Sequence, residues 1–198
     1  ADAEASLTAS LEKMQLDYVD MVLLHWPYGN VYEAWRTLEE FYKNGKIRAI
    51  GISNFDADRM IDLITFNKIK PCINQIETHL LCQRKNENKW LKRYGLAHQA
   101  YVPLGQGRAN EMLRNETVKE ISANHCKTPA QIALRYLAQN GISVIPKSVH
   151  TDRIRENINI FDFVLTDEEM KALSALDTAT PMIGKAESPE TTEFAMTW

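Results

Sequence analysis

The chain has 198 residues, 44% of them hydrophobic, and a formal net charge of −3 at pH 7. This length and composition can bury a core, while the absence of a clustered basic run argues against nucleic-acid binding. No apolar stretch approaches the roughly 18 residues of a membrane span, and the acidic N-terminus shows no apolar signal region, so we expect neither a membrane partner nor a signal peptide.

The cysteines are three in number and widely spaced. Cys72, Cys82 and Cys126 include no Cys-x-x-Cys pair, which predicts free thiols in a reducing, cytoplasmic compartment. The five histidines also lack the paired spacing of metal ligands. We therefore expect no metal site.

Short apolar runs alternate with amphipathic stretches from the start of the chain to its end. The first run, Val22–Leu24, is stopped by Pro27 and predicts a short buried parallel strand that ends at His25. Capping boxes at Thr128 and Thr166 predict two helix starts. The expected strands are 19–25, 47–52, 72–76, 96–102 and 142–145, and the expected helices are 5–15, 31–44, 57–67, 86–94, 115–125, 129–139, 152–158 and one that begins after Thr166.

The remaining stretch, 178–198, contains Gly and Pro with little periodicity, and we expect a surface loop or tail there. No linker separates the strand–helix units, so residues 1–198 are expected to form a single domain. Alternation of strands and helices predicts a parallel α/β sheet with right-handed crossovers. Either a doubly wound sheet or part of a (β/α)8 barrel fits this pattern, although Gly105-Gln-Gly107 is only a weak match to a dinucleotide-binding turn.

Polar or aromatic residues lie at the carboxyl ends of all five predicted strands. Because the carboxyl ends of parallel strands meet at one edge, these residues predict a ligand-binding site there. The residues are His25-Trp26, Ser53-Asn54, Gln75, Tyr101 and Lys147-Ser148.

Four motifs carry a family resemblance. They are Leu-Leu-His-Trp-Pro, Gly-Lys-Ile-Arg-Ala-Ile-Gly-Ile-Ser-Asn-Phe, Asn-Gln-Ile-Glu and Ile-Pro-Lys-Ser-Val, and their order and spacing resemble those of the aldo-keto reductase family. The resemblance implies a (β/α)8 TIM barrel, of which this chain would hold the five C-terminal β/α units. It also implies an oxidoreductase that transfers a hydride from NADPH to a small aldehyde or ketone.

The resemblance assigns roles to individual residues. His25 matches the active-site histidine that holds the substrate carbonyl oxygen, and Trp26 a wall of the substrate pocket. The implied NADP(H)-binding residues form four groups. The nicotinamide would be held by Ser53, Asn54, Gln75 and Tyr101, and the pyrophosphate by Leu104 within the turn Pro103–Gly107. The adenosine 2′-phosphate would be held by Lys147, Ser148 and Arg153, and the adenine by Glu156 and Asn157.

The family's proton-donating tyrosine, with its supporting lysine and aspartate, belongs to the first three barrel strands, and these strands do not match any part of this sequence. We expect the 198 residues to be part of a longer chain, with the whole protein a monomer or a weak oligomer. The alternative is a non-catalytic NADP-binding barrel subunit, with a redox-sensing or structural role. A misfolded or domain-swapped fragment is a weaker alternative.

Overall fold

The computed structural model describes residues 3–106, 108–183, 188–195 and 197. The chain divides into two compact units. The first unit comprises residues 1–75, 89–97 and 185–198, and the second comprises residues 76–88 and 98–184.

The strands follow one another in chain order across a parallel sheet, β1-β2-β3-β4-β5. In the first unit Val19 of β1 faces Ile47 of β2, and Ser53 of β2 faces Gln75 of β3. In the second unit His98 of β4 faces Ile142 of β5. All five predicted strands are confirmed, with bounds β1 Val19–Leu24, β2 Ile47–Ser53, β3 Ile73–Glu77, β4 Ala97–Tyr101 and β5 Ile142–Val144.

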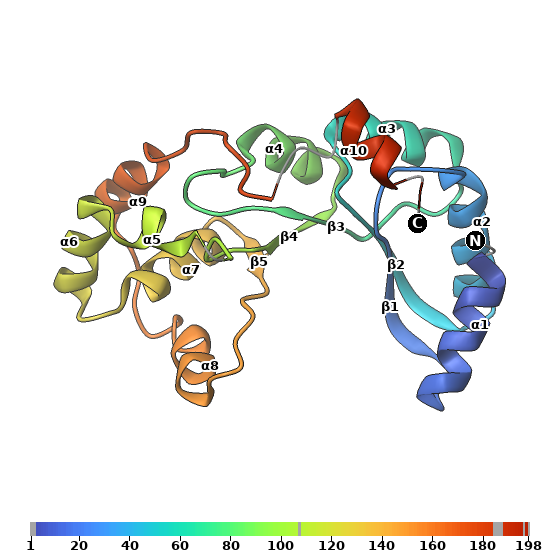
Figure 1. The fold of residues 1–198 in the computed structure, drawn as a ribbon, viewed down its shortest axis with the longest axis horizontal. Coiled ribbons are helices and arrows are strands. Elements are labelled where there is room, and N and C mark those ends of the chain that lie inside the picture. The colour runs from blue at the N-terminus through green and yellow to red at the C-terminus, as the bar shows by residue number, and fades with distance from the viewer. Residues whose placement is uncertain (1–2, 107, 184–187, 196, 198) are drawn as a thin grey trace. The chain divides into compact units, whose positions relative to one another are not determined.

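Helix α2 packs against β1 and β2 in the first unit (Figure 1). The Asn30 side chain caps its first turn, and Trp35 on its inner face is fully buried, with the indole Nε1 donating to the Ile69 carbonyl at 3.0 Å. The other helices of this unit, described in whole or in part, are α1 Ala3–Met14, α3 Ala57–Phe66, α4 Lys85–Tyr94 and α10 Pro189–Ala195, and α2 itself spans Val31–Lys43.

Strand β1 is less buried than its sequence predicts. Val22, Leu23 and Leu24 are only half-buried, and Met21 is 45% exposed. Because β1 ends the row of strands and pairs with β2 alone, an apolar run that would be covered on both faces inside a sheet stays accessible here.

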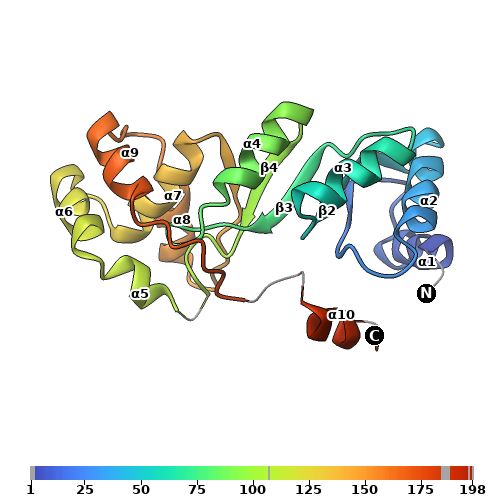
Figure 2. The ribbon, with the colours of Figure 1, turned by 90° about the horizontal axis from the view of Figure 1, so that it is seen from above.

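The second unit has its own hydrophobic core, built on helices α6, α7 and α9, which lie together in both ribbon views (Figures 1 and 2). The capping boxes predicted at Thr128 and Thr166 are both confirmed, and they begin α7 and α9. The sequence analysis did not find the short helix α5. The helices of this unit are α5 Ala109–Leu113, α6 Glu116–His125, α7 Pro129–Gln139, α8 Thr151–Ile158 and α9 Asp167–Ser174.

The tail expected to be a loop over 178–198 contains a helix, α10, so that prediction is wrong for Pro189–Ala195. Pro189 stands at the first helical position, where a backbone N–H would have no partner inside the helix. Ser188, the residue before it, accepts a hydrogen bond from Thr191 N through its hydroxyl oxygen. Positions 184–187, 196 and 198 of this tail lie outside the described residues. Within the described part of the chain, no helix is both long and apolar enough to cross a membrane.

The turn after β2 places Asn54 in the left-handed region, with φ of 62°. Its backbone N–H donates to the Gln75 carbonyl at 3.0 Å, and its side-chain amide donates to the His25 carbonyl at 3.0 Å. Asparagine tolerates this conformation better than most residues because its short polar side chain bonds locally. One residue therefore ties together the ends of β1, β2 and β3.

Glycine is needed at position 51, between β1 and β3. A Cβ there would lie 2.5 Å from Ile73 Cγ2 and 2.6 Å from Leu23 Cδ2. We expect Gly51→Ala to lower the free energy of unfolding by about 1–3 kcal/mol through overpacking, as measured by urea denaturation. Ser143→Ala, on exposed β5 surface, is the control and should change it by less than about 0.5 kcal/mol. A Gly51→Ala variant as stable as the parent would contradict this packing.

The backbone conformation of Asn54 gives a second prediction. Asn54→Ala and Asn54→Gly both lose the hydrogen bond to His25, but only alanine meets the left-handed penalty of about 1–2 kcal/mol. Glycine has an entropic cost of about 0.5–1 kcal/mol instead, so we expect the glycine variant to be the more stable by about 0.5–1 kcal/mol in urea denaturation. Alanine ranking above glycine would show that this turn is not held in the left-handed region.

Candidate functional site

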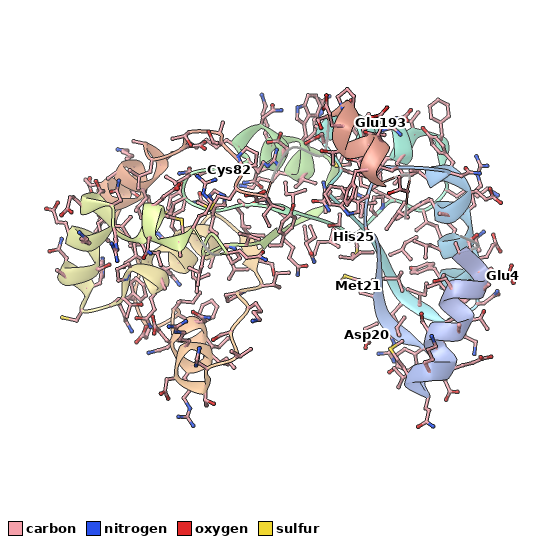
Figure 3. The ribbon with its side chains drawn as sticks, in the orientation of Figure 1. Glu4, Asp20, Met21, His25, Cys82 and Glu193 are labelled. Atoms are coloured by element: carbon pink, nitrogen blue, oxygen red, sulfur yellow. The ribbon has the colours of Figure 1, made fainter. Side chains whose placement is uncertain are left out.

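His25 stands immediately after β1 with an exposed side chain, and Figure 3 shows it beyond Asp20 and Met21 along the strand. Its ring lies 5.5 Å from that of Trp26, at an interplanar angle of 51°. Trp26 in turn stacks on Tyr28, with ring centroids 5.7 Å apart and an interplanar angle of 9°. The end of β1 is thus an aromatic surface next to an accessible imidazole.

The Trp26 indole has a donor that the protein leaves unused. Its Nε1 is buried, yet it has no hydrogen-bond acceptor within the described ranges. Buried donors in folded proteins are nearly always paired, and an exception points to an unseen partner such as a ligand or a water.

Ser53, Asn54 and Gln75 come together at the neighbouring ends of β2 and β3, as the parallel register requires. The Ser53 hydroxyl donates to the Gln75 carbonyl at 2.8 Å, and the Asn54 amide donates to the Ser53 oxygen at 3.2 Å. Sequence reasoning assigned all three side chains to a nicotinamide carboxamide and missed this internal network. The network fixes the strand ends whether or not a ligand is bound.

Tyr101 ends β4 in the second unit and is half-buried. Burial raises the pKa of its phenol to about 12, and the nearby Glu77 carboxylate adds to the effect. The phenol is therefore neutral at physiological pH, and its stacking on a nicotinamide ring stays a prediction. Leu104, half-buried in the turn that follows, stands before Gly105, whose φ is 77°. Gly107 of this predicted turn lies outside the described residues.

Lys147, Ser148 and Arg153 lie where β5 leads into α8. Both cationic side chains are exposed, and neither forms an ion pair with a carboxylate of the described residues. The Ser148 hydroxyl accepts from His150 N at 3.1 Å, which orders the turn just before the helix. A helix N-terminus with two free cations is a favourable place for a phosphate dianion.

The two residues predicted to contact adenine are partly engaged by the protein itself. Glu156 accepts from the Thr128 hydroxyl through its carboxylate and from the Gln131 side-chain amide through its backbone carbonyl. Asn157 is half-buried beside Ile154 and Ile158, in a cavity of about 500 Å³ between β5 and α8. Their contact with a cofactor stays a prediction.

A buried Glu77–His79 pair in the second unit escaped the sequence analysis. Both side chains are completely buried, and His79 Nε2 lies 3.1 Å from Glu77 Oε1. Burial alone would raise the pKa of the Glu77 carboxyl, but hydrogen bonds from His79 and from the Met182 and Ile183 amides outweigh burial and hold that pKa below its ordinary value. The available signal was the Glu-x-His spacing after β3, because alternate residues of an extended segment share a face.

Comparison with known proteins extends over most of the chain. The sequence profile described as the Aldo/keto reductase family matches residues 1–178. The chain is 43% identical over 174 residues to a glyoxal reductase of Bacillus subtilis, and the aligned region covers 87% of this chain and 62% of that protein. It is 40% identical over 177 residues to a methylglyoxal reductase of Yersinia pestis, covering 88% of this chain and 64% of that protein. The chain thus spans less than two thirds of the length of these relatives.

Solved structures agree with the sequence comparison. An aldo-keto reductase from a Medee basin deep-sea metagenome library matches with a TM-score of 0.91 and 36% identity over 94% of this chain and 69% of that one. An aldo-keto reductase complexed with NADPH matches with a TM-score of 0.87 and 34% identity, over 92% of this chain and 62% of that one. The five parallel strands correspond to part of a (β/α)8 barrel, as predicted, and the chain belongs to the aldo/keto reductase family.

Proposed function

We propose that the protein to which this chain belongs reduces a small aldehyde or ketone to an alcohol, with NADPH as the hydride donor. The family match and the names of the reductases to which it is similar support this reaction class. NADPH supplies a hydride to the carbonyl carbon, and a proton must reach the carbonyl oxygen to complete the alcohol.

The observation that carries the proposal is a pair of exposed cations at the start of α8. Lys147 and Arg153 leave their charges uncompensated by any described carboxylate, on either side of the Ser148 turn. Surface cations this close to a helix N-terminus fit the 2′-phosphate that distinguishes NADPH from NADH. Tyr101 and the Leu104 turn belong to the same unit as these cations and would contact the nicotinamide ring and the pyrophosphate.

At the end of β1, His25 and Trp26 would receive the carbonyl compound. The exposed imidazole of His25 would donate a hydrogen bond to the carbonyl oxygen and stabilise the negative charge that develops there. The Trp26 ring would form an apolar wall beside the carbonyl compound and exclude water from it.

We further propose that the protein acts in the cytoplasm as a monomer or a weak oligomer. Cys72, Cys82 and Cys126 all carry free thiols, which suits a reducing compartment.

The cofactor assignment gives a binding prediction. We expect Lys147→Ala and Arg153→Ala each to raise the dissociation constant for NADPH about tenfold and to leave that for NADH nearly unchanged, because each removes one charge-assisted bond to the 2′-phosphate. Titration of tryptophan fluorescence with each nucleotide measures both constants. Arg155→Ala is the matched control, since Arg155 lies on the same helix, is exposed and lies 3.7 Å from Asp152. Equal losses for NADPH and NADH would contradict a phosphate-specific role.

The catalytic assignment is tested by turnover of methylglyoxal by the full-length protein, followed by NADPH absorbance. We expect His25→Ala to lower kcat by about 10²-fold or more, the usual cost of removing one hydrogen-bond donor from a developing oxyanion. His125→Ala should leave kcat within about twofold, because its imidazole is bonded to Glu169. NADPH binding without turnover of any aldehyde or ketone by the unmodified full-length protein would instead favour a non-catalytic binding role.

A further inference from the structure

A histidine lies beside the buried carboxylate of Glu77 and helps to keep it negatively charged. His79 Nδ1 accepts a hydrogen bond from Leu81 N at 3.2 Å, so the ring proton must be on Nε2, which donates to Glu77 Oε1. This single ring N–H offsets only part of the loss of water around the Glu77 charge, so the carboxylate needs further donors.

Those donors come from a segment about a hundred positions further along the chain. Glu77 Oε1 accepts from the backbone N–H groups of Met182 and Ile183, and Oε2 also accepts from Ile183 N at 3.2 Å. Two successive N–H groups that converge on one anion form a small concave binding site of the backbone. This arrangement fixes the register of the segment, since sliding it by one residue would take a donor away from a buried charge.

The other end of the same segment is tied to the loop after β3. Asp177 Oδ1 accepts from Gln83 N at 3.1 Å. The Leu81 carbonyl accepts from Thr178 N at 3.0 Å and from the Thr178 hydroxyl at 2.9 Å. Residues 177–183 are thus held at both ends, by the Asp177 carboxylate and Thr178 at the start and by the buried Glu77 carboxylate at the end.

The charged end of the segment lies against residues assigned above to the cofactor. Met182 Sδ is only 3.0 Å from the place where a Cβ of Gly105 would be, so Met182 contacts the turn 103–106. The backbone of Tyr101 lies next to that of Glu77, because the Tyr101 carbonyl accepts from the N–H of the following residue, Thr78, at 3.2 Å. Met182 thus links the Glu77 carboxylate, which its N–H bonds, to the turn 103–106, which its side chain contacts.

We propose that Glu77 is a positioning residue for the dinucleotide: its buried carboxylate docks residues 177–183 so that Met182 holds the turn 103–106 in its cofactor-binding shape. The proposal rests on the proposed NADPH binding. Glu77 is buried and touches no cofactor itself; it acts through the backbone amides of Met182 and Ile183.

The docking step is tested without any cofactor, by hydrogen exchange of the Met182 and Ile183 amides. We expect Glu77→Gln to speed their exchange at least tenfold while the amides of α7 stay protected. Glu169→Gln is the matched control, because Glu169 also bonds a histidine, His125, and a backbone N–H, that of Thr166, but not the 177–183 segment. Unchanged exchange at Met182 and Ile183 in Glu77→Gln would overturn the docking role, whether or not the protein binds NADPH.

The positioning step is tested by NADPH titration of the same variants. We expect Glu77→Gln to raise the dissociation constant about tenfold, Glu77→Asp to raise it less because the charge is retained, and Glu169→Gln to leave it unchanged. Fast exchange at Met182 and Ile183 with unaltered NADPH affinity would overturn the positioning role. If the unmodified protein binds no NADPH, the proposed function fails and the positioning role fails with it, while the exchange data still report on docking alone.

A second variant covers the case in which Glu77→Gln does not fold. Met182→Ala removes the side chain beside Gly105 but keeps the half-exposed segment and both N–H donors to Glu77. We expect slow exchange of both amides and a several-fold weaker binding of NADPH. Parental NADPH affinity in Met182→Ala would overturn the contact through which Glu77 is proposed to act.

Discussion

One residue, Asn54, connects the ends of β1, β2 and β3 by hydrogen bonds from its side chain and its backbone. Its amide reaches the His25 carbonyl, and its N–H reaches the Gln75 carbonyl. Parallel strands in a sheet are aligned by their ladders, but ladders alone do not fix where the chain leaves each strand. By bonding carbonyls at both neighbouring strand ends, Asn54 sets the direction in which the chain presents His25 and Trp26.

In each unit, hydrogen bonds fix an irregular segment beside the strand ends, but the groups that form them differ. In the first unit the anchor is a set of neutral groups, and losing one bond costs about 1 kcal/mol. In the second unit the anchor is the buried charge of Glu77, and leaving that charge without its donors costs several times more. The charged anchor suits a segment such as 177–183, which belongs to no helix or strand and so has no ladder or helical turn to hold its second half in register.

The sequence predicted the elements whose signals are local. The strand order follows from the alternation of apolar runs and helices, and the starts of α7 and α9 follow from capping boxes at Thr128 and Thr166. The exposure of Met21 was not predictable, because it depends on β1 lying at the end of the row of strands rather than on the residues near it. Nor was the docking of Met182 on Glu77, which joins residues more than a hundred positions apart by a backbone group that every amino acid except proline possesses.

The predicted site residues are of two kinds: some have donors already engaged in hydrogen bonds within the protein, and others are exposed. The Ser53 hydroxyl donates to Gln75, and the Asn54 amide nitrogen donates to both His25 and Ser53, so these donors are used before any ligand arrives. Lys147 and Arg153, by contrast, are exposed cations without a carboxylate partner in the described chain. A ligand gains most from groups that the protein leaves unsatisfied, since no internal bond must be broken.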